Sequence, residues 1–136
     1  MQAQSFPQSN QTAKSLTSSP TFFERLKEIT ESERQRDYGH PLWNFLRIAI
    51  RWNIYFGTRI DMVITPVDVA FMMIDMKLAR LQNTYTDDSV LDLAGYASCV
   101  GRMDEKLKEL EIMDGVKVFN TMNVREMMDF LKEHGE

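Results

Sequence analysis

Charged residues are concentrated in one short stretch of the sequence, DMKLARLQNTYTDDSVLDLAGYA, which covers residues 75–97. The charged members are Asp75, Lys77, Arg80, Asp87, Asp88 and Asp92. Carboxylates can bind Mg²⁺ together with waters and substrate phosphates, and lysine and arginine stabilise phosphoryl oxygens. The residue types therefore suit a site for a phosphorylated ligand, and they also suit ion pairs between two helices.

Helical spacing separates the charges of the helix expected over 65–81 into two flanks, at about 100° per residue. Asp68 and Asp75 lie on one flank, and Lys77 and Arg80 lie on the other. The carboxylates and the cations of this helix should therefore point in different directions.

In the next predicted helix, Asp88 and Asp92 are four residues apart, so their side chains are neighbours on one face. The loop QNTYTD is short and should make the two helices antiparallel neighbours. Counting outward from this loop pairs Arg80 with Asp88 and Lys77 with Asp92. As exposed ion pairs, each would contribute roughly 0–1 kcal/mol. The spacing allows both a binding site and structural ion pairs.

Capping signals place the starts of the helices. TFFE is a capping box with Thr21 at the N-cap, and TPVD places Thr65 at another N-cap. Asp87 is the expected N-cap of the helix after the loop. Gly95 in that helix costs helix stability and suggests a close approach to the backbone. The predicted helices cover 21–38, 41–57, 66–81 and 87–111, with a final helix from about residue 124.

Apolar stripes indicate which helix faces are buried. The second helix should be covered on two sides, and the third should be the most enclosed. The core face of the third helix is predicted to hold Val67, Ala70, Phe71, Ile74, Leu78 and Leu81. The core face of the fourth is predicted to hold Val90, Leu93, Ala97, Val100, Leu107 and Leu110.

The fold class that follows is all-α, an antiparallel bundle of four main helices with a C-terminal helical appendix. Residues 1–19 are rich in Gln, Ser and Thr and are expected to form a flexible polar arm. The bundle is expected over 20–112. The appendix, 113–136, should contain a short extended run at 116–119 before its helix.

Composition narrows the classes of function. The chain has 136 residues, a formal net charge of −4, a pI of about 5.2 and one cysteine, Cys99. An acidic chain without a basic run is a poor nucleic-acid binder. We expect a cytoplasmic protein with no membrane segment and no disulfide. The second helix, apolar on more than one side, predicts a homo-oligomer.

Three segments, RQRDYGHPLWNF, TPVDVAFMMIDMKLAR and DDSVLDLAGYA, together resemble a family of small all-helical proteins of tailed phages and prophages. Members typically show Tyr-Gly, then a DVA…K.AR helix, then a D…D.AGYA helix. The similarity covers 34–103. It implies a phage-encoded protein in the host cytoplasm, of a domain family of unknown function.

That group in turn resembles, more distantly, the MazG-like all-α nucleoside triphosphate pyrophosphohydrolases and phage domains associated with nucleotide modification. In the MazG-like family, a Glu-x-x-Glu helix and a Glu-x-x-Asp helix bind Mg²⁺. Here SVLD has Asp92 in the Asp place and Ser89 in the Glu place, and the first motif is missing.

Two functions remain open. The chain could bind a nucleotide or another phosphorylated small molecule, as a Mg²⁺-dependent pyrophosphohydrolase if it is an enzyme. Alternatively, it could be a non-catalytic phage interaction protein, such as a host-factor inhibitor, a virion component or a signalling-nucleotide sponge. No catalytic residue is identified. The site residues proposed for the first function are Asp88, Asp92, Asp75 and Asp68 for the metal, Lys77 and Arg80 for phosphate, and Tyr38 and Tyr96 for the base or ribose.

Overall fold

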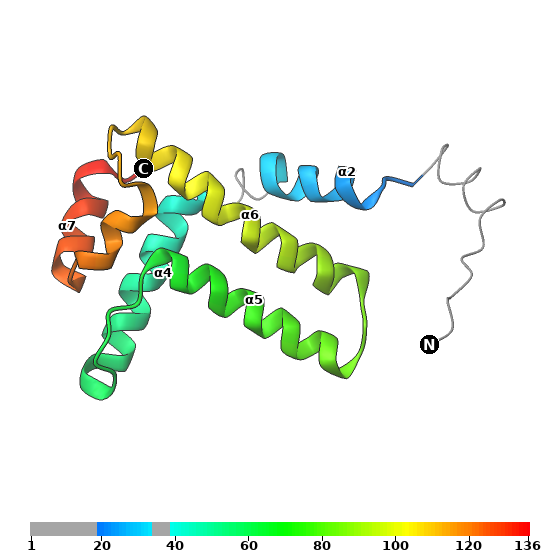
Figure 1. Cartoon of the computed structure of the whole chain (residues 1–136), viewed down its shortest axis with the longest axis horizontal. Coiled ribbons are helices and arrows are strands. Elements are labelled where there is room, and N and C mark those ends of the chain that lie inside the picture. The colour runs from blue at the N-terminus through cyan, green and yellow to red at the C-terminus, as the bar shows by residue number, and fades with distance from the viewer. Residues whose placement is uncertain (1–18, 34–38) are drawn as a thin grey trace.

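The computed structural model describes residues 19–33 and 39–136, and every regular element in these two ranges is a helix (Figure 1). The all-α prediction is therefore confirmed. The α-helices are α2 (Phe22–Lys27), α4 (Pro41–Phe56), α5 (Pro66–Asn83), α6 (Asp87–Glu109) and α7 (Val124–His134). The other elements are the π-helix η1 (Glu28–Glu33) and the 3₁₀-helices η2 (Gly57–Arg59) and η3 (Gly115–Thr121).

The centre of the fold is an antiparallel hairpin of α5 and α6, which lie side by side along their length (Figure 1). Helix α4 crosses the end of this hairpin that lies away from the connecting loop. Helix α7 packs against α4, and η3 packs mainly against α6. The segment α2–η1 lies along α6. The hairpin thus carries the charged stretch, with a different neighbour on each side of α6.

Two of the predicted N-caps, Thr21 and Thr65, are formed, and a third is displaced by one residue. Thr21 and Glu24 make a reciprocal capping box at the start of α2, and Thr65 and Asp68 make another at the start of α5. Helix α6 begins one residue earlier than expected, because Thr86 rather than Asp87 is its N-cap. The Thr86 side chain accepts a hydrogen bond from the backbone N–H of Ser89 at 3.2 Å.

Helix α4 has more buried residues than the other described helices, although Ile54 and Tyr55 near its C-terminal end are 63% and 71% exposed. Leu42, Leu46 and Ala49 are fully buried, and Phe45 and Ile50 nearly so. The C-terminal segment contributes to the same core through other large side chains, Phe119, Met127 and Phe130. The Phe130 ring lies 6.2 Å from that of Trp43. Residues 113–136 therefore pack into the core, and the proposed domain boundaries remain a prediction.

The predicted enclosure of the third helix is wrong. Phe71 and Leu78 of α5, expected in the core, are 54% and 44% exposed, whereas Ala70 is fully buried as predicted. Val69 and Lys77, which were not expected in the core, are also buried. The buried face of α5, which contacts α4 and α6, is therefore rotated from the predicted apolar stripe.

The buried face of α6 also differs from the predicted one. Ala97 is exposed, while Leu91, Gly95, Tyr96 and Cys99 are buried. This buried face continues directly from Asp88 and Asp92 on the helical wheel, so the acidic face of α6 becomes its core face within one turn. The two carboxylates therefore start the side of α6 that turns towards the rest of the protein.

Two further predictions concern residues 116–119 and the end of the first helix. Residues 116–119, expected to be extended, lie inside the 3₁₀-helix η3. The β-branched residues there fit a short helix because Asp104 accepts a hydrogen bond from the Val116 N–H at 3.0 Å and fixes the turn. The expected end of the first helix at Tyr38 falls outside the described residues. Within the described ranges, none of the helices is long and apolar enough to cross a membrane.

Candidate functional site

The cation Lys77 and the carboxylate Asp92 join the two helices of the hairpin. The Lys77 Nζ lies 3.0 Å from Oδ2 of Asp92, and the two side chains are only 11% and 27% exposed. The pairing predicted from the distance of each residue to the loop is therefore confirmed. Burying two charges away from water costs desolvation free energy. The short distance between Lys77 and Asp92 offsets part of this cost, and a functional role for the pair is the other reason for which it could be retained.

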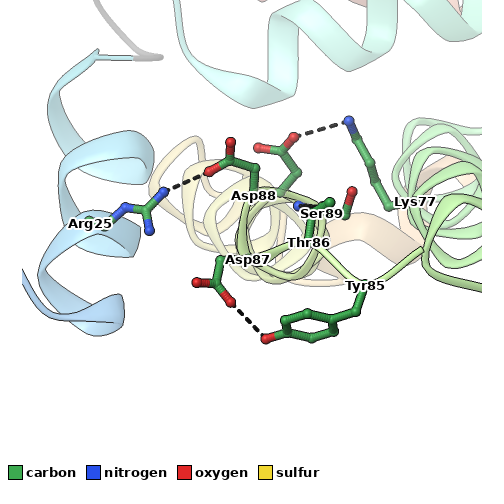
Figure 2. Close-up of polar contacts among 8 residues, drawn as sticks. Arg25, Lys77, Tyr85, Thr86, Asp87, Asp88 and Ser89 are labelled. Atoms are coloured by element: carbon green, nitrogen blue, oxygen red, sulfur yellow. Dashed lines mark hydrogen bonds and ion pairs between the residues drawn. The ribbon is translucent and has the colours of Figure 1, made fainter.

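Counting residues from the loop predicted that Asp88 pairs with Arg80. In the structure, Asp88 pairs instead with Arg25 on α2. Figure 2 shows Arg25 reaching from α2 to Asp88, and the Nη2–Oδ1 distance is 2.7 Å. Arg80 is exposed and makes no ion pair with any residue in the described ranges. The predicted pair of Arg80 with Asp88 is wrong because α2 covers the flank of α6 that carries Asp88. No local signal links Arg25 to Asp88, since they are 63 residues apart.

Asp87 takes no part in this arrangement and lies on a different side of α6. Its Oδ1 accepts a hydrogen bond from the Tyr85 hydroxyl at 2.8 Å, as Figure 2 shows. This hydrogen bond and the carboxylate charge raise the pKa of the Tyr85 hydroxyl above its usual value. Asp87 therefore fixes the loop between the hairpin helices, and it serves as a natural control for its neighbour Asp88.

An open groove of about 600 Å³ lies between α2–η1 and α6. This volume falls in the range of small-molecule sites. Four carboxylates and one guanidinium line it together with apolar residues, so its charge is predominantly negative. The lining residues are Pro20, Glu24, Arg25, Glu28, Ile29, Asp88, Leu91 and Asp92. The sequence did not predict that α2–η1 would form one wall of this groove, because its capping box indicates a short helix but not where that helix packs.

The other two proposed metal ligands lie elsewhere on α5. Asp68 Oδ2 accepts hydrogen bonds from the Thr65 N–H at 2.8 Å and the Thr65 hydroxyl at 3.1 Å. It belongs to the capping box and lines a different groove, beside Asn123. Asp75 is exposed on α5 and is not among the residues that line the α2–α6 groove. The four predicted carboxylates are thus not brought together within one chain.

In the part of the chain that the structure describes, no three His, Cys, Asp or Glu side chains are grouped so that they could hold a metal ion. Mg²⁺ often arrives with substrate phosphates and then needs only one or two protein carboxylates. Asp88 and Asp92, both at the groove, fit this second case. The donor set suits an ion carried by a nucleotide rather than a cage built wholly from protein.

Of the two tyrosines proposed to contact the base or ribose, Tyr38 and Tyr96, the structure describes only Tyr96. Tyr96 is buried, and its ring packs 6.3 Å from that of Phe45, so it is a core residue of α6. Tyr38 falls outside the described residues. Gly95 was expected to permit a close approach to the helix, but a Cβ added there would meet nothing within 4 Å. Among the described residues, therefore, no close neighbour requires a glycine at this buried position.

Comparison with known proteins agrees with the phage resemblance. The Gene 55 protein of Mycobacterium phage D29 is 40% identical over 94 residues, which cover 68% of this chain and 60% of that relative. The Gene 55 protein of Mycobacterium phage L5 is 42% identical over 78 residues, which cover 57% of this chain and 48% of that relative. The chain thus spans between about half and three fifths of the length of these curated relatives.

No solved structure is significantly similar to the chain. The relatives and the family match support a phage-type protein, and neither of them shows a similarity to MazG-like enzymes. The family model covers residues 21–104, which is more than half of the chain and includes both walls of the groove. The chain belongs to the family described as a domain of unknown function, DUF6378.

Proposed function

We propose that the groove between α2–η1 and α6 binds a nucleotide, or a similar phosphorylated small molecule, as its Mg²⁺ complex. The observation that carries this proposal is the position of Asp88 and Asp92. They lie one turn apart at the start of the core-facing side of α6, and both line the groove. Each carboxylate already has a cation beside it, Arg25 at 2.7 Å and Lys77 at 3.0 Å.

The charge of the groove explains why Mg²⁺ belongs to the proposal. Glu24, Glu28, Asp88 and Asp92 outnumber Arg25 among the lining residues, so a bare polyphosphate would be repelled. A Mg²⁺ ion held by Asp88 and Asp92 would offset two of the three net negative charges of the lining residues. Arg25, the cation of the lining, would then be placed to neutralise phosphate oxygens, while Lys77 would compensate the charge of Asp92 from outside the groove.

Turnover is a separate step from binding. If the bound nucleotide is hydrolysed, water would be the nucleophile and pyrophosphate the product, as the MazG resemblance implies. The groove contains two further carboxylates, but Glu24 already accepts a hydrogen bond from the Thr21 N–H in the capping box of α2, and no hydrogen bond marks Glu28 as a general base. We therefore place binding ahead of catalysis.

A thermal-shift panel of nucleotides, which includes nucleoside triphosphates as well as cyclic and modified nucleotides, tests this proposal with and without Mg²⁺. A ligand present at about 100 times its Kd stabilises the folded state by about 2.7 kcal/mol. We expect a rise in Tm of several degrees that requires Mg²⁺ and disappears in Asp92→Asn. The control is Asp75→Asn, which changes a carboxylate of the same hairpin outside the groove. A panel without any shift would reject the proposal.

A second candidate function, a non-catalytic interaction protein, is favoured by the exposed surface of α5. Four large apolar side chains are between 40% and 54% exposed there: Phe71, Met72, Met76 and Leu78. Apolar residues grouped on one helix commonly mark a protein–protein contact. A second copy of this chain is the simplest partner, so we retain the homo-oligomer as a proposal. Under this function, a host or virion partner should co-purify stoichiometrically, whereas Mg²⁺-dependent turnover would contradict it.

A further inference from the structure

The segment α2–η1, residues 22–33 and here termed the strap, is only lightly attached to the protein. Its contacts outside itself are principally with α6. None of the residues of α2 is buried. Phe22, Leu26 and Ile29 are half-buried, and Phe23 is 77% exposed. The strap therefore rests on α6 without joining the main hydrophobic core.

Among the described side chains, two polar contacts join the strap to α6. The ion pair between Arg25 and Asp88 has side chains that are 36% and 83% exposed, and exposed pairs of this kind are weak. The second contact runs from the Arg102 guanidinium to the backbone carbonyl of Thr30, within the π-helix. Elements with few buried apolar contacts open locally at low cost. The strap is thus the described element best suited to leave its neighbour.

The strap packs over Leu91, an apolar side chain of α6 that does not belong to the main hydrophobic core. Leu91 is only 2% exposed, but it is absent from the cluster of buried core residues. It lines the groove together with Ile29 of the strap. Removing the strap would expose Leu91 between Asp88 and Asp92, because all three line the same wall. The uncovered face would be an apolar residue flanked by two carboxylates.

We infer that the strap is a reversibly docked cover, and that the α6 face beneath it is a docking site for an arginine-bearing amphipathic helix of a partner protein. The strap shows which chemistry fits this face. Phe22, Leu26 and Ile29 follow the i, i+4, i+7 spacing of a helix that lies in an apolar groove. Arg25 supplies the positive charge that complements Asp88. A partner helix with the same pattern would replace the strap, and the inference does not require the groove to bind a nucleotide.

Hydrogen exchange of the full chain, followed by mass spectrometry, tests the docking of the strap. The strap amides should exchange at least about tenfold faster than those of α4 and α6. Asp88→Asn should accelerate this exchange further, whereas Asp87→Asn on the neighbouring position should leave it unchanged. Strap amides that are protected as strongly as those of α6, and that do not respond to Asp88→Asn, would overturn the inference.

A labelled synthetic peptide of residues 19–33 then tests the docking site in trans. In the unmodified chain, the strap competes in cis at a high effective concentration and lowers the apparent affinity of the peptide. The full chain with Arg25→Glu should release its own strap and bind the unmodified peptide at least about tenfold more tightly. Equal affinity of the two chains for the peptide would contradict the proposed site.

A charge reversal keeps this test specific. A chain carrying Asp88→Arg, which repels Arg25 of its own strap, should bind the unmodified peptide weakly and a peptide with Arg25→Glu more tightly. Retained preference for the unmodified peptide would show that Asp88 does not define the face. A dimer of the Arg25→Glu chain that dissociates when peptide is added would assign the face to a second copy and overturn the assignment to a partner protein.

Discussion

The Nζ atom of Lys77 on α5 lies 3.0 Å from a carboxylate oxygen of Asp92 on α6, in a position where both side chains are largely shielded from water. This contact connects the two helices of the hairpin. Asp92 also lines the groove between the strap and α6. One residue therefore belongs both to the packing of the hairpin and to the proposed binding site, and the two roles can be separated by mutation.

Lys77→Met should lower the free energy of unfolding by about 1–3 kcal/mol. Removing one partner of a fully buried pair costs about 3–5 kcal/mol, and the remaining exposure of this pair reduces that figure. Urea denaturation measures the change. Arg80→Met on the same helix is the control and should change stability by less than about 0.5 kcal/mol, because Arg80 is exposed. Equal effects of the two substitutions would show that the Lys77–Asp92 contact contributes nothing.

Gly115→Ala should destabilise the chain by about 2 kcal/mol or more. Gly115 has φ +58°, and an added Cβ would overlap the Asp104 carboxylate. That carboxylate is held by Lys108 at 2.9 Å and by the Val116 N–H, and these contacts lower its pKa. Thermal denaturation measures the loss. Unchanged stability would mean that the turn between α6 and η3 adapts to the added methyl group.

Gly95→Ala should have the opposite effect and stabilise the chain by up to about 1 kcal/mol. None of the residues that the structure describes has an atom within 4 Å of a Cβ added at this helical position of α6, so the gain in helix propensity should dominate. The same denaturation assay gives the result. A loss of stability or of oligomer would indicate that something approaches this glycine in an assembly.

Stability should decrease as the pH falls below about 6.5, because of His40. Its Nδ1 accepts a hydrogen bond from the Leu42 N–H at 3.1 Å and caps α4. Burial lowers the pKa of His40 below its usual 6.5, and the charges of Arg102 and Lys106 lower it further. The unfolded chain therefore binds the proton more readily, so this stabilisation is present above pH 6.5 and is lost as the pH falls through the lower folded-state pKa.

The substitution His40→Asn isolates this effect, because asparagine also caps helices but does not titrate. Its free energy of unfolding should depend less on pH between 7.5 and 5.5 than that of the unmodified chain. The difference should reach about 1 kcal/mol, the usual contribution of an N-cap. Parallel pH profiles for both chains would exclude His40 as the cause.

The apolar surface of α5 should mediate self-association. Sedimentation velocity at micromolar concentration should show a dimer or larger oligomer for the unmodified chain. The double substitution Phe71→Glu and Leu78→Lys should yield a monomer, because it places charges on an apolar contact. Phe23→Glu, at an exposed aromatic outside α5, is the control and should not dissociate the oligomer. An unmodified chain that sediments as a monomer would contradict this prediction.

Local signals in the sequence predicted much of the fold. The capping boxes at Thr21 and Thr65 depend on residues three positions apart, and both form. The pairing of Lys77 with Asp92 followed from their distances to one short loop. Such predictions succeed because both partners belong to one helix or to two consecutive helices.

The features that the sequence did not predict depend on how elements distant in the sequence pack against one another. The contact of Arg25 with Asp88 depends on where the strap packs, and nothing near either residue specifies that. The exposure of Phe71 depends on which face of α5 packs against α4 and α6. The apolar stripe on α5 indicated burial, and the structure leaves Phe71 and Leu78 of that stripe exposed.

The central claim is that Asp88 and Asp92 bind a Mg²⁺–nucleotide complex in the groove between the strap and α6. Isothermal titration of the full chain with the nucleotide that gives the largest thermal shift tests it most directly. The account predicts Mg²⁺-dependent binding that weakens at least about tenfold in Asp88→Asn and in Asp92→Asn and is unchanged in Asp75→Asn and Asp87→Asn. Binding that is absent, or that is equally strong in all four variants, would contradict the account.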